Sequence, residues 1–121
     1  MPHLHVEYTP NLAALEPQKL LLRLNHALVA TGQFAHEADI KARATAVEVF
    51  QVGTMPAERG FIYARLAILS GRPEQVKKTL SDALLEVLKG AAPWPPGLDV
   101  QFGVDIVDMD RASYGKARIG G

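Results

Sequence analysis

The sequence contains no cysteine among its 121 residues. This absence excludes disulfides, thiol nucleophiles and thiolate metal ligands, and it fits a reducing compartment. No apolar run approaches the ~20 residues that a membrane-spanning helix needs. The first residues carry no basic leader followed by an apolar stretch, so we expect no signal peptide. We therefore expect a cytoplasmic protein that has no membrane partner.

The chain also lacks an excess of charge of either sign. Thirteen Lys and Arg residues balance thirteen Asp and Glu residues, for a formal net charge of +0. No basic excess points to nucleic acid, and Gly-rich phosphate loops and Ser-containing nucleophile motifs are absent. The composition, 48% hydrophobic and 21% charged, is that of a globular protein. Any electrostatic function must therefore come from the local placement of charges.

The hydrophobic pattern predicts two units of about 60 residues, each with a strand, a helix and a second strand. Apolar residues alternate with period two in the strands and recur at helical spacing in the helices. Pro17 suits the first turn of a helix, and Gly32 and Gly90 are stop signals. The predicted strands are residues 2–8, 40–51, 61–69 and about 100–106; the helices run from Pro17 to Gly32 and from Pro73 to Gly90.

This order predicts an α/β (α+β) fold of tandem βαβ units, with a four-stranded mixed sheet and two helices on one face. Each unit should pair its strands in parallel through a right-handed crossover. We expect one domain over residues 1–121, with repeat units at about 2–51 and 61–107 and a tail at 108–121. Parallel strands are normally covered on both faces. With no further helix to cover the second face, the chain is expected to form an oligomer.

Pro2 follows Met1 directly and opens the first predicted strand. If Met1 is removed, the Pro2 nitrogen becomes a free secondary amine, and an α-amino group has a reference pKa of about 7.7–8.0. Burial and nearby cations lower such a pKa further, toward the range that suits proton transfer. The ordinary alternative is a proline at the first position of a strand, where this residue is tolerated.

Three cations are candidates for binding an anion. Lys41 and Arg43 are two apart on one predicted strand and so share a face. The two side chains form either a carboxylate-binding site or a solvated strand edge that discourages aggregation. Arg72 precedes a helix whose first position is Pro73, where free N–H groups and the dipole favour an anion. Alone, Arg72 could equally be a surface residue.

Several segments resemble a known family. Residues 64–80, with the turn Ser70-Gly71-Arg72-Pro73, resemble the strand, turn and helix start of 4-oxalocrotonate tautomerase. Residues 2–8, Asn11-Leu12 and 30–34 resemble 5-carboxymethyl-2-hydroxymuconate isomerase, a tandem-repeat branch of the tautomerase superfamily. The resemblance covers nearly the whole chain and is weakest in the loops and the tail.

The resemblance implies a homotrimer with a barrel-like assembly and a cofactor-independent isomerase. The implied substrate is an enol or unsaturated di- or tricarboxylate from aromatic ring cleavage, in this branch 5-carboxymethyl-2-hydroxymuconate in 4-hydroxyphenylacetate (homoprotocatechuate) degradation. Carried over by position, Pro2 is the general base and acid, and Arg72, Arg43, Lys41 and Tyr114 bind the substrate. Lys41 stands where relatives tend to have arginine, so it keeps the charge but loses the planar two-pronged grip.

Other features favour structural roles. His3 and His5 share a strand face, but two histidines without a third ligand favour packing or hydrogen bonding over a metal site, so no metal is expected. Arg65 is expected to pair with Glu7 or Glu48 across the sheet. A non-catalytic binding or assembly module with the same order of elements, including a ferredoxin-like ligand-binding domain, is the alternative to an enzyme, because fold alone does not decide function.

Overall fold

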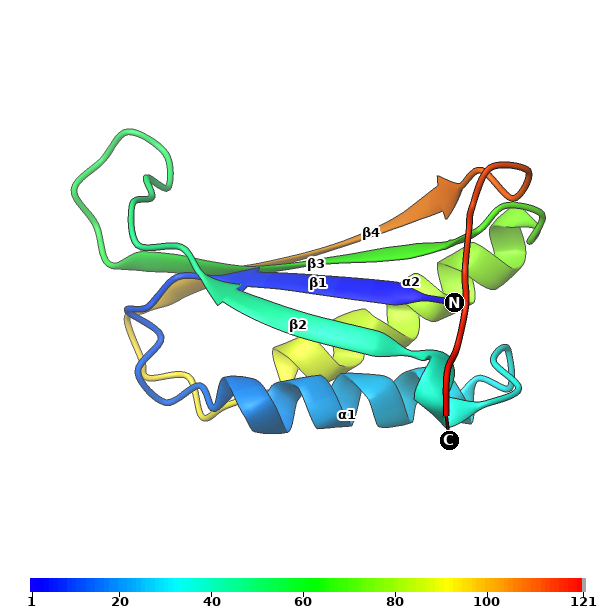
Figure 1. The fold of residues 1–121 in the computed structure, drawn as a ribbon. Coiled ribbons are helices and arrows are strands. Elements are labelled where there is room, and N and C mark those ends of the chain that lie inside the picture. The colour runs from blue at the N-terminus through cyan, green and yellow to red at the C-terminus, as the bar shows by residue number, and fades with distance from the viewer. Residues whose placement is uncertain (121) are drawn as a thin grey trace.

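The computed structural model describes residues 1–120 (Figure 1). These residues form four strands, two long helices and one 3-10 turn. In chain order these are β1 (His3–Tyr8), α1 (Pro17–Ala30), η1 (Glu37–Asp39), β2 (Lys41–Ala46), β3 (Arg59–Leu69), α2 (Glu74–Lys89) and β4 (Asp99–Met109).

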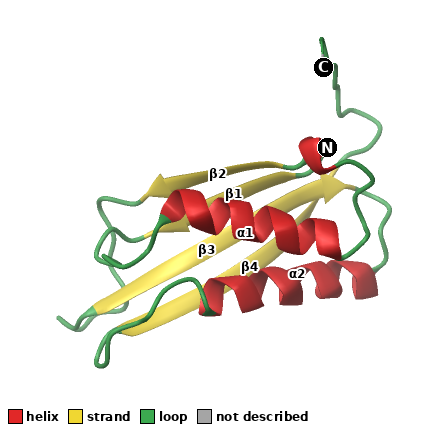
Figure 2. Cartoon of the chain, turned by 90° about the horizontal axis from the view of Figure 1, so that it is seen from below, coloured by secondary structure: helices red, strands yellow, loops and turns green. Residues whose placement is uncertain are grey.

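The four strands form one mixed sheet in the order β2-β1-β3-β4. β1 pairs with β2 and β3 pairs with β4 in parallel, whereas the central strands β1 and β3 are antiparallel. Both helices pack side by side on the same face of the sheet (Figure 2). The predicted tandem βαβ architecture is thus confirmed, with each helix serving as the crossover of its own unit.

The core lies between the sheet and the two helices. Every second residue of β1 and β3 points into it, and each helix contributes leucines four residues apart, because these spacings place side chains on one face. The buried side chains include Leu4, Val6, Leu20, Leu24, Leu28, Ile62, Ala64, Leu66, Ile68, Leu80, Leu84 and Leu88.

No helix within residues 1–120 is long and apolar enough to cross a membrane.

The strand predicted over residues 40–51 is shorter in the structure, where β2 spans only Lys41–Ala46. β2 lies at the edge of the sheet, and in the part of the chain that the structure describes it pairs only with β1, so the six residues of β1 set its length. Past that point the Val47 N–H still donates to the Tyr8 carbonyl at 2.9 Å, and the chain then leaves the sheet in the long loop before β3 (Figure 1). The Val- and Thr-rich sequence does not by itself indicate where β2 stops pairing with β1.

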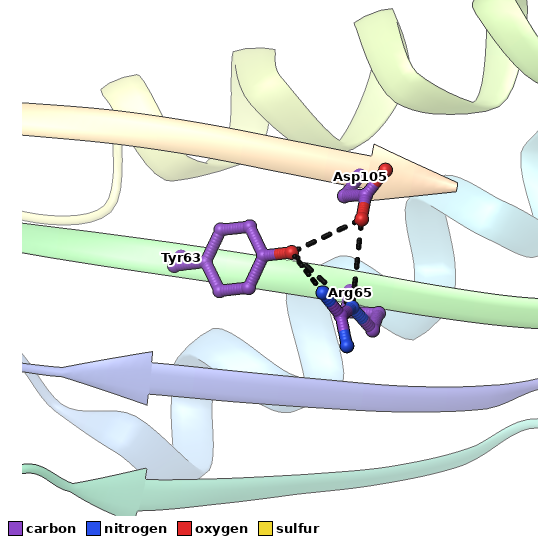
Figure 3. A network of polar contacts seen from close by, with 3 residues as sticks. All are labelled: Tyr63, Arg65 and Asp105. Carbon is purple, nitrogen blue, oxygen red and sulfur yellow. Dashed lines mark hydrogen bonds and ion pairs between the residues drawn. The ribbon is translucent and has the colours of Figure 1, made fainter. Parts of the chain in front are cut away.

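Arg65 does not pair with Glu7 or Glu48 as expected. The parallel register of β3 and β4 places it opposite Asp105, and its Nε lies 3.5 Å from a carboxylate oxygen of that residue. The Tyr63 hydroxyl, between them, donates to Asp105 at 3.1 Å and accepts from Arg65 Nη2 at 3.0 Å (Figure 3). The neighbouring strand β4, rather than β1, therefore supplies the partner.

The second face of the sheet has no helix over it within residues 1–120. It carries the alternate residues of each strand, and these are mostly polar: His3 and His5 on β1, Lys41 and Arg43 on β2, and the Tyr63–Arg65 pair on β3. We call this the open face.

The pairing directions gather four chain segments at one edge of the sheet. Parallel pairing aligns the start of β1 with the start of β2, and the end of β3 with the end of β4. Antiparallel pairing of β1 and β3 then brings these starts and ends together, with His3 opposite both Lys41 and Ala67. In Figure 1 the N-terminus and the descending tail lie together at this edge, and the loop after β2 projects from the opposite edge. Residues preceding β1 and following β3 and β4 therefore meet in space.

Gly60 sits against a buried turn at that opposite edge, and its replacement provides a test of the packing. A Cβ there would lie 2.7 Å from Thr9 Oγ1 and 2.8 Å from Leu12 Cδ2. Thr9 is fully buried and its hydroxyl accepts the Phe61 N–H at 3.1 Å, so it has little room to move. We expect Gly60→Ala to lower the free energy of unfolding by about 1–3 kcal/mol, the usual cost of overpacking. Urea denaturation measures this change in the free energy of unfolding. Gly97→Ala is the control for backbone strain, because a Cβ at Gly97 meets nothing within 4 Å although φ there is 87°. An unchanged stability in Gly60→Ala would contradict this packing.

Candidate active site

A cleft of about 280 Å³ opens at the edge where the four segments meet. Pro2 precedes β1, Phe34 and Asp39 come from the connection between α1 and β2, Arg72 lies between β3 and α2, and Arg111 follows β4. The structure thus brings together two predicted site residues, Pro2 and Arg72, although 69 positions separate them in sequence.

Pro2 is buried and fixed by the sheet. Its carbonyl accepts the Lys41 N–H at 3.1 Å, which extends the β1–β2 ladder to the first residues of the chain. Met1 precedes it and also lines the cleft. The backbone at Pro2, including its nitrogen, is therefore held in place by the sheet.

The surroundings of the N-terminus favour an uncharged amine. Burial lowers the pKa of the Met1 amino group below its ordinary 8.0, and the charges of Lys116, Lys41 and Arg72 lower it further. The Asp39 carboxylate acts in the opposite direction. An amine at this edge consequently releases its proton more readily than a terminal amine in water.

The Arg72 guanidinium is positioned before any substrate arrives. Its Nη2 donates to the Gln33 carbonyl at 2.9 Å, and its Cζ lies 5.0 Å from the centre of the Phe34 ring. The contact with the aromatic face and the hydrogen bond hold the guanidinium on the wall of the cleft. Its remaining N–H groups can then donate to an anion.

Lys41 lies near the N-terminus, but Arg43 and Tyr114 belong to a different cluster. Lys41 Nζ donates to the Asp39 carbonyl at 2.8 Å and lies 3.5 Å from the Met1 sulfur. Arg43 Nη2 contacts His3 Nδ1 at 2.6 Å, and His3 Nε2 contacts the Tyr114 hydroxyl at 2.8 Å. His3, Arg43 and Tyr114 therefore form a chain of contacts on the open face and do not line the cleft with Pro2. Substrate binding by Arg43 and Tyr114 stays a prediction.

The neighbours of His3 require its neutral form. A guanidinium can only donate, so His3 Nδ1 accepts from Arg43 and Nε2 carries the ring proton toward Tyr114. Burial lowers the pKa of His3 below its ordinary 6.5, and the Arg43 and Lys41 charges lower it further.

The lowered pKa of His3 predicts that the protein loses stability as the pH becomes acidic. The unfolded chain binds the His3 proton more tightly than the folded chain, so the contribution of this residue is complete above pH 6.5 and declines as the pH falls below 6.5. We expect the free energy of unfolding of His3→Gln, measured in urea from pH 7.5 to 5, to fall less steeply than that of the unaltered protein. His26→Gln, on the exposed side of α1, is the control for the loss of a histidine elsewhere in the chain. Equal slopes for His3→Gln and the unaltered protein would count against this account.

Two cleft residues were missed by the sequence reasoning. Phe34 lies in residues 30–34, for which the resemblance predicts no side-chain role, and Arg111 lies in the polar tail at 108–121. Arg111 could have been found from the parallel pairing of β3 and β4, because the pair Leu69 and Met109 brings the residues after both strands together. Among the residues described by the structure, no group of three or more His, Asp and Glu side chains could hold a metal ion.

The arrangement can bind an anion beside an amine of lowered pKa. An amine of lowered pKa next to a fixed guanidinium is suited to moving a proton within a substrate whose carbonyl oxygen gains charge.

Comparisons with known proteins agree with this chemistry. The family model of 5-carboxymethyl-2-hydroxymuconate isomerase matches residues 2–114. A 5-carboxymethyl-2-hydroxymuconate isomerase from Deinococcus radiodurans R1 is 30% identical, with 98% of this chain and 90% of that chain covered and a TM-score of 0.82. No curated protein matches the sequence.

Two further solved structures share the fold at lower identity. A 5-carboxymethyl-2-hydroxymuconate delta-isomerase is 19% identical over 99% of this chain and 89% of that chain, with a TM-score of 0.80. A symmetric trimer of fused 4-OT is 23% identical over 95% of this chain and 91% of that chain, with a TM-score of 0.71. With its fold shared by these structures and its family model matched from residue 2 to residue 114, the chain belongs to the 5-carboxymethyl-2-hydroxymuconate isomerase family and is an isomerase.

Proposed function

We propose that the protein is a cofactor-independent tautomerase that moves a proton within an enol or unsaturated di- or tricarboxylate, with Pro2 as general base and acid after Met1 is removed. The proposed substrate is 5-carboxymethyl-2-hydroxymuconate, in the degradation of 4-hydroxyphenylacetate. The observation that carries the proposal is the cleft lined by both Pro2 and Arg72, whose guanidinium is held by Gln33.

The proposed reaction uses the two groups in different ways. The Pro2 nitrogen takes the proton from the enol oxygen or the adjacent carbon and returns it to the carbon that becomes saturated. Arg72 stabilises the negative charge that develops on the substrate oxygen, where one fixed donor contributes about 2.7–4 kcal/mol. Lys41, near Met1, lowers the pKa of the terminal amine and attracts the carboxylates.

A homotrimer is part of the proposal. The fused 4-OT structures that share this fold include symmetric and asymmetric trimers. The open face, which no helix of this chain covers within residues 1–120, supports an assembly in which neighbouring subunits cover it. Arg43 and Tyr114 lie on that face with His3, so in the trimer their contact with substrate would be made across a subunit boundary.

The test is an absorbance assay on several enol acids, including 2-hydroxymuconate and 5-carboxymethyl-2-hydroxymuconate. The protein should be confirmed by intact mass to begin at Pro2, because a retained Met1 acylates the proposed base. We expect rapid loss of enol absorbance, fastest with the tricarboxylate. If a correctly processed protein accelerates none of the reactions over buffer, catalysis through Pro2 is excluded and a binding or assembly module of the same fold becomes the better explanation.

A further inference from the structure

Arg111 is the second guanidinium of the cleft. It lies on a turn that begins directly after β4, in which the Asp110 carbonyl accepts the N–H groups of Ser113 at 3.2 Å and Tyr114 at 3.1 Å. Tyr114, at the end of the turn, contacts His3 on β1. The turn is therefore fixed at both ends, and Arg111 is not carried by a free tail.

Arg111 is also held by Ser70, which follows β3. Its backbone N–H donates to Ser70 Oγ at 3.2 Å, and its Nε donates to the Ser70 carbonyl at 2.9 Å. The Ser70 N–H in turn donates to the Met109 carbonyl at 2.9 Å. Ser70 lies two residues before Arg72, so the same short turn at the end of β3 positions both guanidinium groups.

The terminal nitrogens of Arg111 remain available for a ligand. Within residues 1–120 neither Nη atom makes a hydrogen bond or an ion pair. The two nearest acids in sequence are engaged elsewhere: Asp108 pairs with Lys77 at 3.3 Å, and Asp110 accepts from the Ser113 hydroxyl at 2.7 Å. Arg111 is thus not explained as half of a surface salt bridge.

The charge of the cleft favours a ligand with two negative groups. Arg72 and Arg111 both line it, and among its lining residues in the described chain Asp39 is the single acid. Each guanidinium presents a planar set of donors that matches a carboxylate. Since Gln33 occupies only one nitrogen of Arg72 and Ser70 only one of Arg111, both retain donors for an anion.

We propose that Arg111 is a specificity-determining residue that binds the carboxylate of the substrate distant from the reacting oxygen, and so selects doubly charged substrates over singly charged ones. This inference rests on the proposed function, in which Arg72 serves the reacting end. It adds Arg111 to the predicted substrate contacts of Arg72, Arg43, Lys41 and Tyr114.

The test is a binding measurement with a matched pair of unreactive ligands. The dianion trans,trans-muconate and the monoanion sorbate have the same six-carbon E,E-diene chain, and they differ in that the terminal methyl group of sorbate is a second carboxylate in muconate. By calorimetric titration we expect Arg111→Gln to weaken muconate binding about 10–100-fold, the loss typical of a hydrogen-bonded charge, and to leave sorbate binding within about twofold. Arg111→Lys should fall between, because it keeps the charge without the fork. Arg23→Gln, a change of exposed charge on α1, is the matched control and should bind as the unaltered protein does.

Steady-state kinetics give an independent readout. With 2-hydroxymuconate, Arg111→Gln should raise KM and leave kcat within about twofold, and with the monoanionic enol of phenylpyruvate neither constant should change. Equal weakening of muconate and sorbate, or no weakening of either, would overturn the role of Arg111. If the muconate loss is found in a protein that isomerises no enol acid, the anion site stands and the proposed catalytic function fails.

Discussion

Protein that keeps Met1 on Pro2 will ketonise enol dicarboxylates at least about 100-fold more slowly than protein that begins at Pro2, because general base catalysis typically supplies about 10²–10⁴-fold. With Met1 attached, the Pro2 nitrogen is a tertiary amide and has no lone pair available for a proton. Met1 also lines the cleft, so its removal clears space as well as freeing the base. Inserting a lysine between Met1 and Pro2 prevents processing and supplies the blocked form, and intact mass verifies each sample.

Pro2→Ala is the companion variant. After removal of Met1 it retains a primary amine at the same edge, so it should be impaired but more active than the blocked form. Near-ultraviolet circular dichroism and the unfolding midpoint show whether each variant folds. Equal activity of blocked and processed protein would eliminate the Pro2 nitrogen as the base.

Replacing Arg72 by alanine has the second largest expected effect, a fall in kcat of about 10²–10³-fold. The reason is the arrangement of the side chain: a hydrogen bond to Gln33 and contact with the Phe34 ring hold its charge in place before the substrate binds. A donor that needs no reorganisation stabilises the developing charge most effectively. Steady-state kinetics on 2-hydroxymuconate measure the loss.

Arg72→Lys tests whether geometry matters beyond charge. Lysine keeps the cation but cannot make the planar contacts with Gln33 and Phe34, so we expect it to recover only part of kcat. Arg23→Gln again serves as the control for a lost surface charge. A KM effect without a kcat effect in Arg72→Ala would place Arg72 in ground-state binding and contradict its assignment to the reacting oxygen.

The fold follows closely from the sequence because its signals are local and repeated. Alternating apolar residues in 61–69 predicted the buried set Ile62, Ala64, Leu66 and Ile68, and Pro17 and Gly90 marked the ends of helices. The end of β2 could not be read in this way. It depends on the length of the neighbouring strand β1. Residues 47–51 have a strand-like composition, but among the described residues they have no strand to pair with.

The candidate site follows from the sequence only in part. The meeting of Pro2 and Arg72 is a consequence of antiparallel pairing between β1 and β3, which the tandem repeat permits but does not by itself dictate. The cluster of His3, Arg43 and Tyr114 depends on the path of the tail across β1. Tail residues carry no periodic signal, so the sequence gives no indication of which strand they meet.

Arg111 shows the same limit at a single residue. Its place in the cleft depends on the parallel register of β3 and β4 and on three hydrogen bonds around Ser70. The hydrogen bonds cannot be inferred from neighbouring residues. The register can be predicted only once β3 and β4 are known to run in parallel to the same edge of the sheet.

The most direct measurement is the pKa of the Pro2 amine, followed by ¹⁵N NMR in processed protein and compared with the pH dependence of kcat/KM. We expect one apparent pKa in both experiments, below the ordinary value of about 8 for a terminal amine. Burial and the charges of Lys116, Lys41 and Arg72 lower the pKa of an amine at this edge, and together they outweigh the opposing effect of Asp39. Activity should rise with pH through that value as the amine loses its proton. A rate profile that does not follow the titration of Pro2, or a Pro2 pKa above the ordinary value, would contradict the central claim.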